Sequence, residues 1–137
     1  MAALSIPISF GEAADKISIL EIKRERIRDS AKLRNIEAEL AQVATAFFEQ
    51  AGSINNFAPL FQALKKVNRR LWDIEDAMRD HERRQDFGSE FARLARSVYL
   101  TNDERWQAKR AIDELFDSPI REEKSYGTYE SGKSGDL

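Results

Sequence analysis

The sequence of 137 residues contains no cysteine and a single histidine. Without cysteine the chain cannot form disulfides, use a thiolate nucleophile, or hold zinc or an iron–sulfur cluster through sulfur. The one histidine, His81, stands in the charged run MRDHERRQ, where we expect it to face solvent. We therefore predict no metal site, and nothing in the sequence implies a cofactor.

Prolines are few, and long apolar runs are missing. Only Pro7, Pro59 and Pro119 occur, each where a boundary between structural elements is expected. No stretch approaches the roughly 20 apolar residues that a membrane span needs. The N-terminal run MAALSIPISF lacks the basic region of a secretory signal. Together with the lack of cysteine, this predicts a cytoplasmic protein that does not associate with a membrane.

An excess of charge of one sign is also missing, since 22 basic and 24 acidic residues leave a net charge of −2. A nucleic-acid surface needs clustered lysine and arginine in excess, so we expect no nucleic-acid partner. What is present is a globular composition, with 42% hydrophobic and 34% charged residues. The length suits one domain. We assign residues 1–126 to a single helical domain and residues 127–137 to a polar, loosely held tail.

The pattern between the prolines predicts an all-α protein. Ser9 and Glu12 have the spacing of a capping box, and the helix that follows, over residues 11–27, carries apolar residues on two sides. Such a helix is either central in a bundle or covered by a partner chain. Asp29 or Ser30 can cap a second helix, and a third follows Pro59. The apolar stripes of these two helices are Leu33, Ile36, Leu40, Val43 and Phe47, and Leu60, Leu64, Val67, Leu71, Ile74 and Met78.

We predict an antiparallel bundle of about four to five helices, preceded by a short extended N-terminus. The helix number depends on SVYLTNDERWQAKR (97–110), which as one helix directs Asn102, Arg105 and Lys109 toward the buried face. Thr101 and Glu104 have capping-box spacing, so we favour a break at Thr101 that leaves both cations at the edge with their charges in water. The alternative is a small-anion site formed by these donors at the edge of the core.

Polar residues also border the stripe of the third helix. Glu75 is the carboxylate that we expect to meet Arg105 or Lys109, either as an interhelical ion pair or as part of a pocket. The segment EEKSYGTY is then a lid over that pocket or simply a docked tail. If the protein is an enzyme, Glu75 is the catalytic candidate. The candidate ligand-binding residues are Lys16, Lys23, Asn68, Trp72, Glu75, Arg79, Tyr99, Asn102, Arg105, Lys109, Lys124 and Tyr126.

Three stretches carry a resemblance: GEAADKISILEIKRERI (11–27), LKKVNRRLWDIEDAMR (64–79), and FARLARSVYLTNDERWQAKRAID through EEKSY (91–126). Together they resemble a family of short bacterial helical proteins that is catalogued only as a domain of unknown function. The resemblance implies that the polar residues of these blocks are neighbours. It implies no activity, cofactor or catalytic residue.

The stretch DKISILEIKRERI alone is similar to part of the helical chorismate mutases. That similarity implies a dianionic substrate held between helices by Arg, Lys and a Glu or Gln, in an intertwined dimer. Two hypotheses stay open. The one we favour is a non-enzymatic helical module, a homodimer because of its two-sided first helix, that binds a partner protein or a small anionic ligand. The other is an enzyme of chorismate-mutase-like type that acts on a small carboxylated or phosphorylated metabolite.

Overall fold

The computed structural model describes residues 2–125, so Tyr126 and the predicted tail 127–137 lie outside the described residues. Over this range the regular secondary structure is entirely helical, which confirms the all-α prediction. The helices are α1 (Phe10–Arg26), α2 (Ser30–Ala51), α3 (Phe57–Arg84) and α4 (Ser89–Leu115). None of these helices is long and apolar enough to cross a bilayer.

Two of the helices begin at the predicted caps. The hydroxyl of Ser9 accepts a hydrogen bond from the Glu12 N–H at 3.0 Å, and the carboxylate of Asp29 accepts one from the Lys32 N–H at 2.9 Å. These bonds satisfy backbone donors that the first helical turn leaves unpaired. The predicted break between α1 and α2 is confirmed. Helix α4 begins at Ser89, and its N-cap residue is Gly88, which has no side chain to accept a hydrogen bond.

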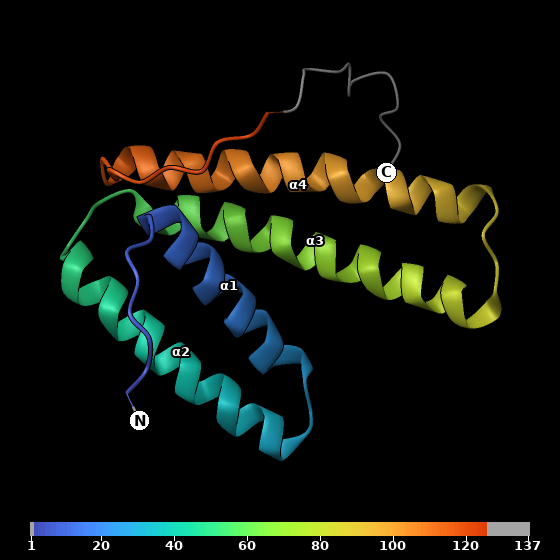
Figure 1. Ribbon diagram of the computed structural model, residues 1–137, viewed down its shortest axis with the longest axis horizontal. Coiled ribbons are helices and arrows are strands. Elements are labelled where there is room, and N and C mark those ends of the chain that lie inside the picture. Colours follow the sequence, from blue (N-terminus) through green and yellow to red (C-terminus); the bar gives the residue numbers. More distant parts are fainter. Residues whose placement is uncertain (1, 126–137) are drawn as a thin grey trace.

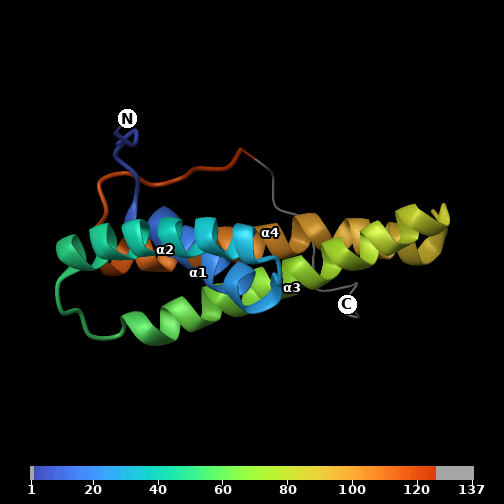
Figure 2. The ribbon, with the colours of Figure 1, turned by 90° about the horizontal axis from the view of Figure 1, so that it is seen from below.

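The helices form two pairs. Within each pair, α1 with α2 and α3 with α4, the chain runs in opposite directions (Figures 1 and 2). Helix α1 lies between α2 and the α3/α4 pair and contacts all three helices. This arrangement explains the apolar residues on two sides of α1 without a partner chain. The α3/α4 pair extends beyond α1 and α2 at the right of Figure 1, and we call residues 74–100 the α3/α4 arm.

The apolar core lies where all four helices meet, away from the arm. Leu64 and Ile112 are fully buried in it. Each large aliphatic side chain buried in this way contributes about 1.5–3 kcal/mol. Stacked and edge-on rings close the end of the core where α1 begins and α4 ends; they belong to Phe10, Phe47, Phe57 and Phe116.

Helix α4 is continuous through Thr101, so the predicted break there is wrong. Leu94, Ser97 and Thr101 are all buried, at the spacing of one helical face. That face is packed along its whole length, and interrupting it would expose residues that the unbroken helix buries. The capping-box spacing of Thr101 and Glu104 is a local preference that tertiary packing overrides.

His81 is also placed differently from the prediction. Its side chain is buried, with 7% of the residue exposed, where α3 turns into α4. The Nδ1 atom lies 3.0 Å from the carbonyl oxygen of Asp86, and the ring lies 6.1 Å from that of Phe91. The charged neighbours in the sequence point elsewhere, because only one side of a helix faces the turn.

Candidate functional site

A buried carboxylate, Asp15 on α1, is the centre of the polar interior, with 2% of the residue exposed. Arg105 of α4 donates to both of its oxygens, from Nε to Oδ1 at 2.9 Å and from Nη2 to Oδ2. Asn68 of α3 donates to the same Oδ1 at 2.9 Å and to the hydroxyl of Ser18 at 2.7 Å. Three helices therefore meet on one carboxylate, and we call Asp15, Ser18, Asn68 and Arg105 the Asp15 cluster.

The Asp15 cluster is closed by its own members. The bidentate geometry is the strongest arrangement for a guanidinium and a carboxylate. The hydrogen bond to Asp15 raises the pKa of Arg105, although burial opposes it, so the guanidinium stays charged. Throughout residues 2–125 every fully buried side-chain nitrogen or oxygen has a hydrogen-bond partner. Arg105 is thus occupied by a carboxylate of the same chain, as a structural residue would be.

Asp15 belongs to a stripe of α1 that sequence reasoning missed. Gly11, Asp15, Ser18 and Ile22 are spaced four, three and four residues apart, and all four are buried. This is the second of the two sides of α1, and it faces α3 and α4. The signal was present in the sequence as polar and small residues in phase with Ile22.

Lys109 of α4 forms a second buried ion-pair group. Its ammonium lies 2.7 Å from Glu12 of α1 and 2.6 Å from Glu122, which follows α4 in the chain. Burial disfavours the charge of Lys109, but hydrogen bonds to Glu12 and Glu122 outweigh it, and its pKa is raised. Lys65 of α3, also missed, is a third buried cation and pairs with Glu21 at 3.1 Å and Glu25 at 2.8 Å. The hydrogen bond from Lys65 lowers the pKa of Glu25.

The predicted meeting of Glu75 with Arg105 or Lys109 is not found. Glu75 is exposed on the α3/α4 arm and pairs with Arg79 at 3.3 Å, one helical turn along α3. The reason is the unbroken α4, which turns Arg105 and Lys109 toward α1, where Asp15 and Glu12 supply the carboxylates. The prediction named the right cations, Arg105 and Lys109, but expected their carboxylate partner on α3, whereas the structure has such partners on α1.

The other predicted residues are spread over the surface of the molecule. Lys16 is exposed and pairs with Glu39 of α2 at 3.5 Å. The guanidinium of Arg26 lies over Trp72, with its Cζ atom 5.8 Å from the centre of the Trp72 ring. Lys23, Asn102 and Lys124 are half-buried, Tyr99 is half-exposed, and Tyr126 is outside the described residues.

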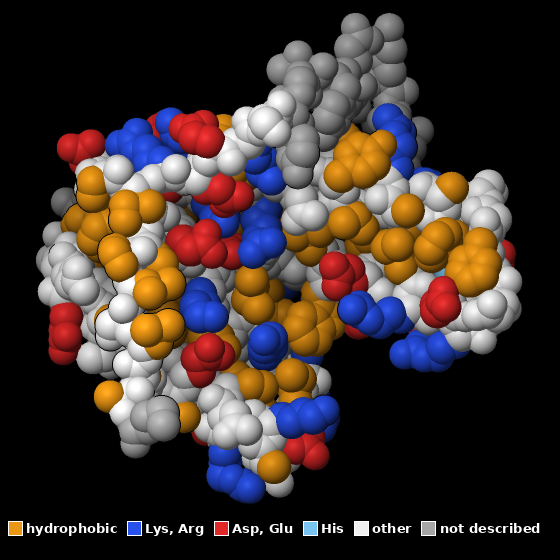
Figure 3. Space-filling model, viewed as in Figure 1, with side chains coloured by type: hydrophobic (Ala, Val, Ile, Leu, Met, Phe, Trp, Pro, Cys, Tyr) orange, Lys and Arg blue, Asp and Glu red, His pale blue; other side chains and the backbone are white. Residues whose placement is uncertain are grey.

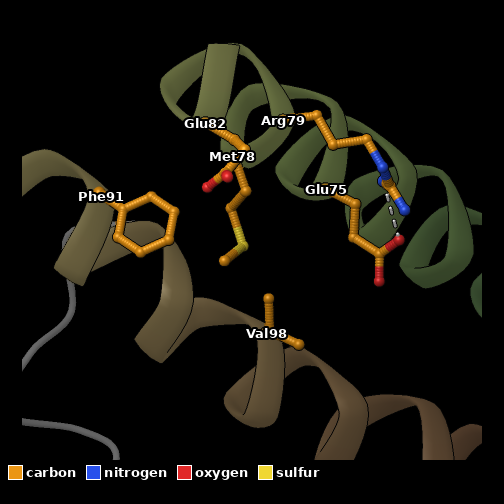
Figure 4. Close-up of a pocket in the computed structure, with 6 residues that line it drawn as sticks. All are labelled: Glu75, Met78, Arg79, Glu82, Phe91 and Val98. Atoms are coloured by element: carbon orange, nitrogen blue, oxygen red, sulfur yellow. Dashed lines mark hydrogen bonds and ion pairs between the residues drawn. The ribbon is translucent and has the colours of Figure 1, made fainter. Parts of the chain in front are cut away.

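An open groove of about 350 Å³ lies between the two helices of the α3/α4 arm, lined by Glu75, Met78, Arg79, Glu82, Phe91 and Val98. Figure 4 shows Met78 of α3 reaching toward Phe91 and Val98 of α4, with the charged side chains along the α3 edge. Hydrophobic side chains also gather on the arm at the right of Figure 3. Two nearby residues, Phe87 and Tyr99, are each 50% exposed. The arm thus presents an apolar surface bordered by charge.

The ion pair between Lys109 and Glu122 depends on pH, and this dependence can be tested. The hydrogen bond from Lys109 lowers the pKa of Glu122 from its usual value of 4.5. The stabilisation from this pair is therefore complete above pH 4.5 and is lost as the pH falls through the lower pKa of the folded state. The Trp106 indole donates to the Glu122 carbonyl at 3.0 Å and lies beside this contact.

We expect Trp106 fluorescence, measured in a Trp72→Phe variant, to change as the pH falls below 4.5 and Glu122 takes up a proton. Far-UV circular dichroism recorded on the same samples separates this step from acid unfolding. The matched control is Glu122→Gln, whose amide does not titrate. A transition of equal amplitude in that variant would show that Glu122 is not its source.

These features define the class of the protein: an all-α chain whose helices are joined at the centre by buried ion pairs and whose longest pair carries an exposed apolar groove. The chain belongs to a family of unknown function, DUF6165, whose family model matches residues 4–136. Neither a curated protein nor a solved structure matches the chain.

Proposed function

We propose that the protein is a non-enzymatic helical interaction module that forms a homodimer through the α3/α4 arm. The observation that carries this proposal is the groove containing Met78, Phe91 and Val98. At the core, α3 and α4 are covered by α1, but along the arm only two helices meet. Two helices bury one stripe between them and leave the flanks of that stripe open, so a second layer is needed to cover them.

The buried cations support an interaction module over a small-anion site. Arg105 and Lys65 each contact at least one carboxylate of the same chain within hydrogen-bond distance. An anionic ligand would have to displace these carboxylates from positions that already satisfy both charges. The arm gains free energy when its exposed apolar side chains leave water.

A second copy of the chain is complementary to the charged side chains that line the groove. In a two-fold dimer each residue faces a partner that faces it in return. Glu75 and Arg79 lie two residues on either side of Ala77. When the two copies of α3 cross near Ala77 in opposite directions, Glu75 of each copy meets Arg79 of the other. The two hairpin arms then form a four-helix bundle around Met78, Phe91 and Val98.

We expect size-exclusion chromatography with light scattering to return twice the 15.7 kDa chain mass at micromolar concentration. Glu75→Arg places two arginines against each other in the dimer and is expected to give the monomer mass. The double variant Glu75→Arg/Arg79→Glu restores the opposite charges and is expected to restore the dimer. This rescue is the readout that a general loss of stability cannot produce.

The matched controls are Asp80→Arg, which reverses an exposed charge that pairs with Arg83 on α3, and Phe48→Glu, which alters an exposed aromatic residue on α2. Both variants are expected to stay dimeric, because neither residue lines the groove. A monomer mass for the unmodified protein would refute the homodimer, and a dimer that survives both Glu75→Arg and Met78→Glu would place its interface elsewhere.

A further inference from the structure

The chain returns along α4 after that helix ends, as Figures 1 and 2 show, and we call residues 118–125 the C-terminal strap. The strap begins at a fixed point, because Ser118 is buried, donates from its N–H to the Asp113 carbonyl at 2.8 Å, and accepts from the Phe10 N–H at 3.2 Å. Beyond Ser118 it adopts no regular secondary structure. Within this segment Arg121 donates to the Ser118 carbonyl at 2.9 Å, and Glu122 and Glu123 contact side chains of α4.

Three of the contacts between the strap and α4 are polar and lie on one face of the helix. The Trp106 indole donates to the Glu122 carbonyl at 3.0 Å. The Glu122 carboxylate pairs with Lys109 at 2.6 Å, and the Glu123 carboxylate pairs with Arg110 at 2.9 Å. Residues 106, 109 and 110 have the spacing of a single helical face. The face therefore recognises one backbone carbonyl and two successive carboxylates.

The face is built independently of the strap that covers it. The guanidinium of Arg110 lies 5.9 Å from the ring centre of Trp106 and 3.7 Å from Glu114 within α4. Lys109 keeps Glu12 as a partner at 2.7 Å. These contacts hold both cations and the indole in place when the strap leaves, and such preorganisation lowers the entropic cost of binding.

The strap itself is held weakly. Its one large apolar side chain, Ile120, is 45% exposed, so apolar burial adds little. Glu122 and Glu123 keep 43% and 74% of their side-chain surface exposed. Water screens carboxylates of this exposure and weakens the ion pairs that they form. A segment of the same chemistry on another protein can therefore compete for the face.

We propose that the Trp106–Lys109–Arg110 face binds an extended acidic segment of a partner protein, with two consecutive acidic residues, and that the strap is its intrachain competitor. The contact to a backbone carbonyl favours a peptide over a free small anion, since a free anion has no amide carbonyl for the indole to bind. This face lies on the C-terminal half of α4, outside the α3/α4 arm, so the inference goes beyond the homodimer.

The test uses a fluorescein-labelled peptide of the strap sequence, SPIREEKS, and fluorescence anisotropy on the full chain. The strap in the unmodified protein competes at an effective concentration near the millimolar range, as a short tether does. Glu122→Gln/Glu123→Gln weakens that competitor, and we expect this variant to bind the peptide about tenfold more tightly than the unmodified protein does. A peptide with glutamine at both acidic positions is expected to bind at least about tenfold more weakly.

Two further variants place the binding on the proposed face. Trp106→Phe removes the indole donor and keeps an aromatic ring, and Arg110→Gln removes a partly exposed cation; each is expected to weaken peptide binding in the strap-weakened background. Glu75→Arg, on the arm, is expected to leave it unchanged, so failure of the dimer and failure of this proposal give different results.

Three outcomes would overturn the proposal. The first is equal binding of the acidic and glutamine peptides, and the second is no gain in affinity when the strap is weakened. The third is displacement of the peptide by citrate at equal carboxylate concentration and matched ionic strength, which would identify a small-anion site in place of a peptide face.

Discussion

Asp15→Ala is expected to lower the free energy of unfolding by about 3 kcal/mol, the lower end of the range for breaking a buried ion pair. The substitution leaves the guanidinium of Arg105 without its bidentate partner and removes an acceptor from Asn68. The lower end applies because the Arg105 side chain is 30% exposed and water can reach part of it. Urea denaturation followed by circular dichroism, at one protein concentration, measures the change.

A double-mutant cycle separates the ion pair from the space that Asp15 fills. We expect Asp15→Ala/Arg105→Met to cost less than the sum of the two single variants, with a coupling of about 2 kcal/mol. The matched control is Glu90→Ala, which removes one partner of Arg93 in an exposed pair and should change stability far less than Asp15→Ala does. A similarly small effect of Asp15→Ala would show that the cluster does not stabilise the fold.

The second large effect is expected at Gly11, where the backbone of α1 lies close to that of α4. Its N–H donates to the Asp113 carboxylate at 2.6 Å, and a Cβ atom at this position would lie 2.7 Å from Asp113 Oδ1 and closer still to the Lys109 carbonyl oxygen. Alanine favours a helix over glycine by about 1 kcal/mol. The backbone carbonyl cannot rotate away, so overpacking of about 1–3 kcal/mol opposes that gain.

We therefore expect Gly11→Ala to destabilise the protein by up to about 2 kcal/mol net, which thermal or urea unfolding would detect. Gly88→Ala is the control, because its Cβ would meet only Asp86 Oδ1, at 3.4 Å, and its φ of −78° suits any residue. Its expected effect is small in either direction. A stabilising effect of Gly11→Ala would show that α1 and α4 separate at little cost in free energy. It would also show that the close approach of these helices does not position the Asp15 cluster.

Helix starts and apolar stripes were predictable because they depend on near neighbours in the chain. The bond from the Glu12 N–H to Ser9 needs only three residues of separation, as does the bond from the Lys32 N–H to Asp29. The stripe of α3 follows from the helical repeat alone. The capping-box spacing of Ser9 and Glu12 did not show that the Glu12 carboxylate also pairs with Lys109 of α4.

The candidate site could be predicted only in part. Sequence periodicity placed Arg105 and Lys109 on the inner face of an unbroken α4, but it could not show which carboxylates pack against that face. Asp15 is 90 residues from Arg105 in the sequence, and only the packing of α1 against α4 brings them together. Without that partner a break at Thr101 looked more favourable than buried cations, because an unpaired buried charge is costly.

The sequence by itself thus determined an all-α chain and the helix boundaries that caps specify. Tertiary structure decided the continuity of α4, the pairing of Arg105 with Asp15, and the projection of the α3/α4 arm beyond α1 and α2. The physical reason is range: caps and helical periodicity act within about a turn or two. The free energy of burying a charge depends on what the rest of the fold places beside it.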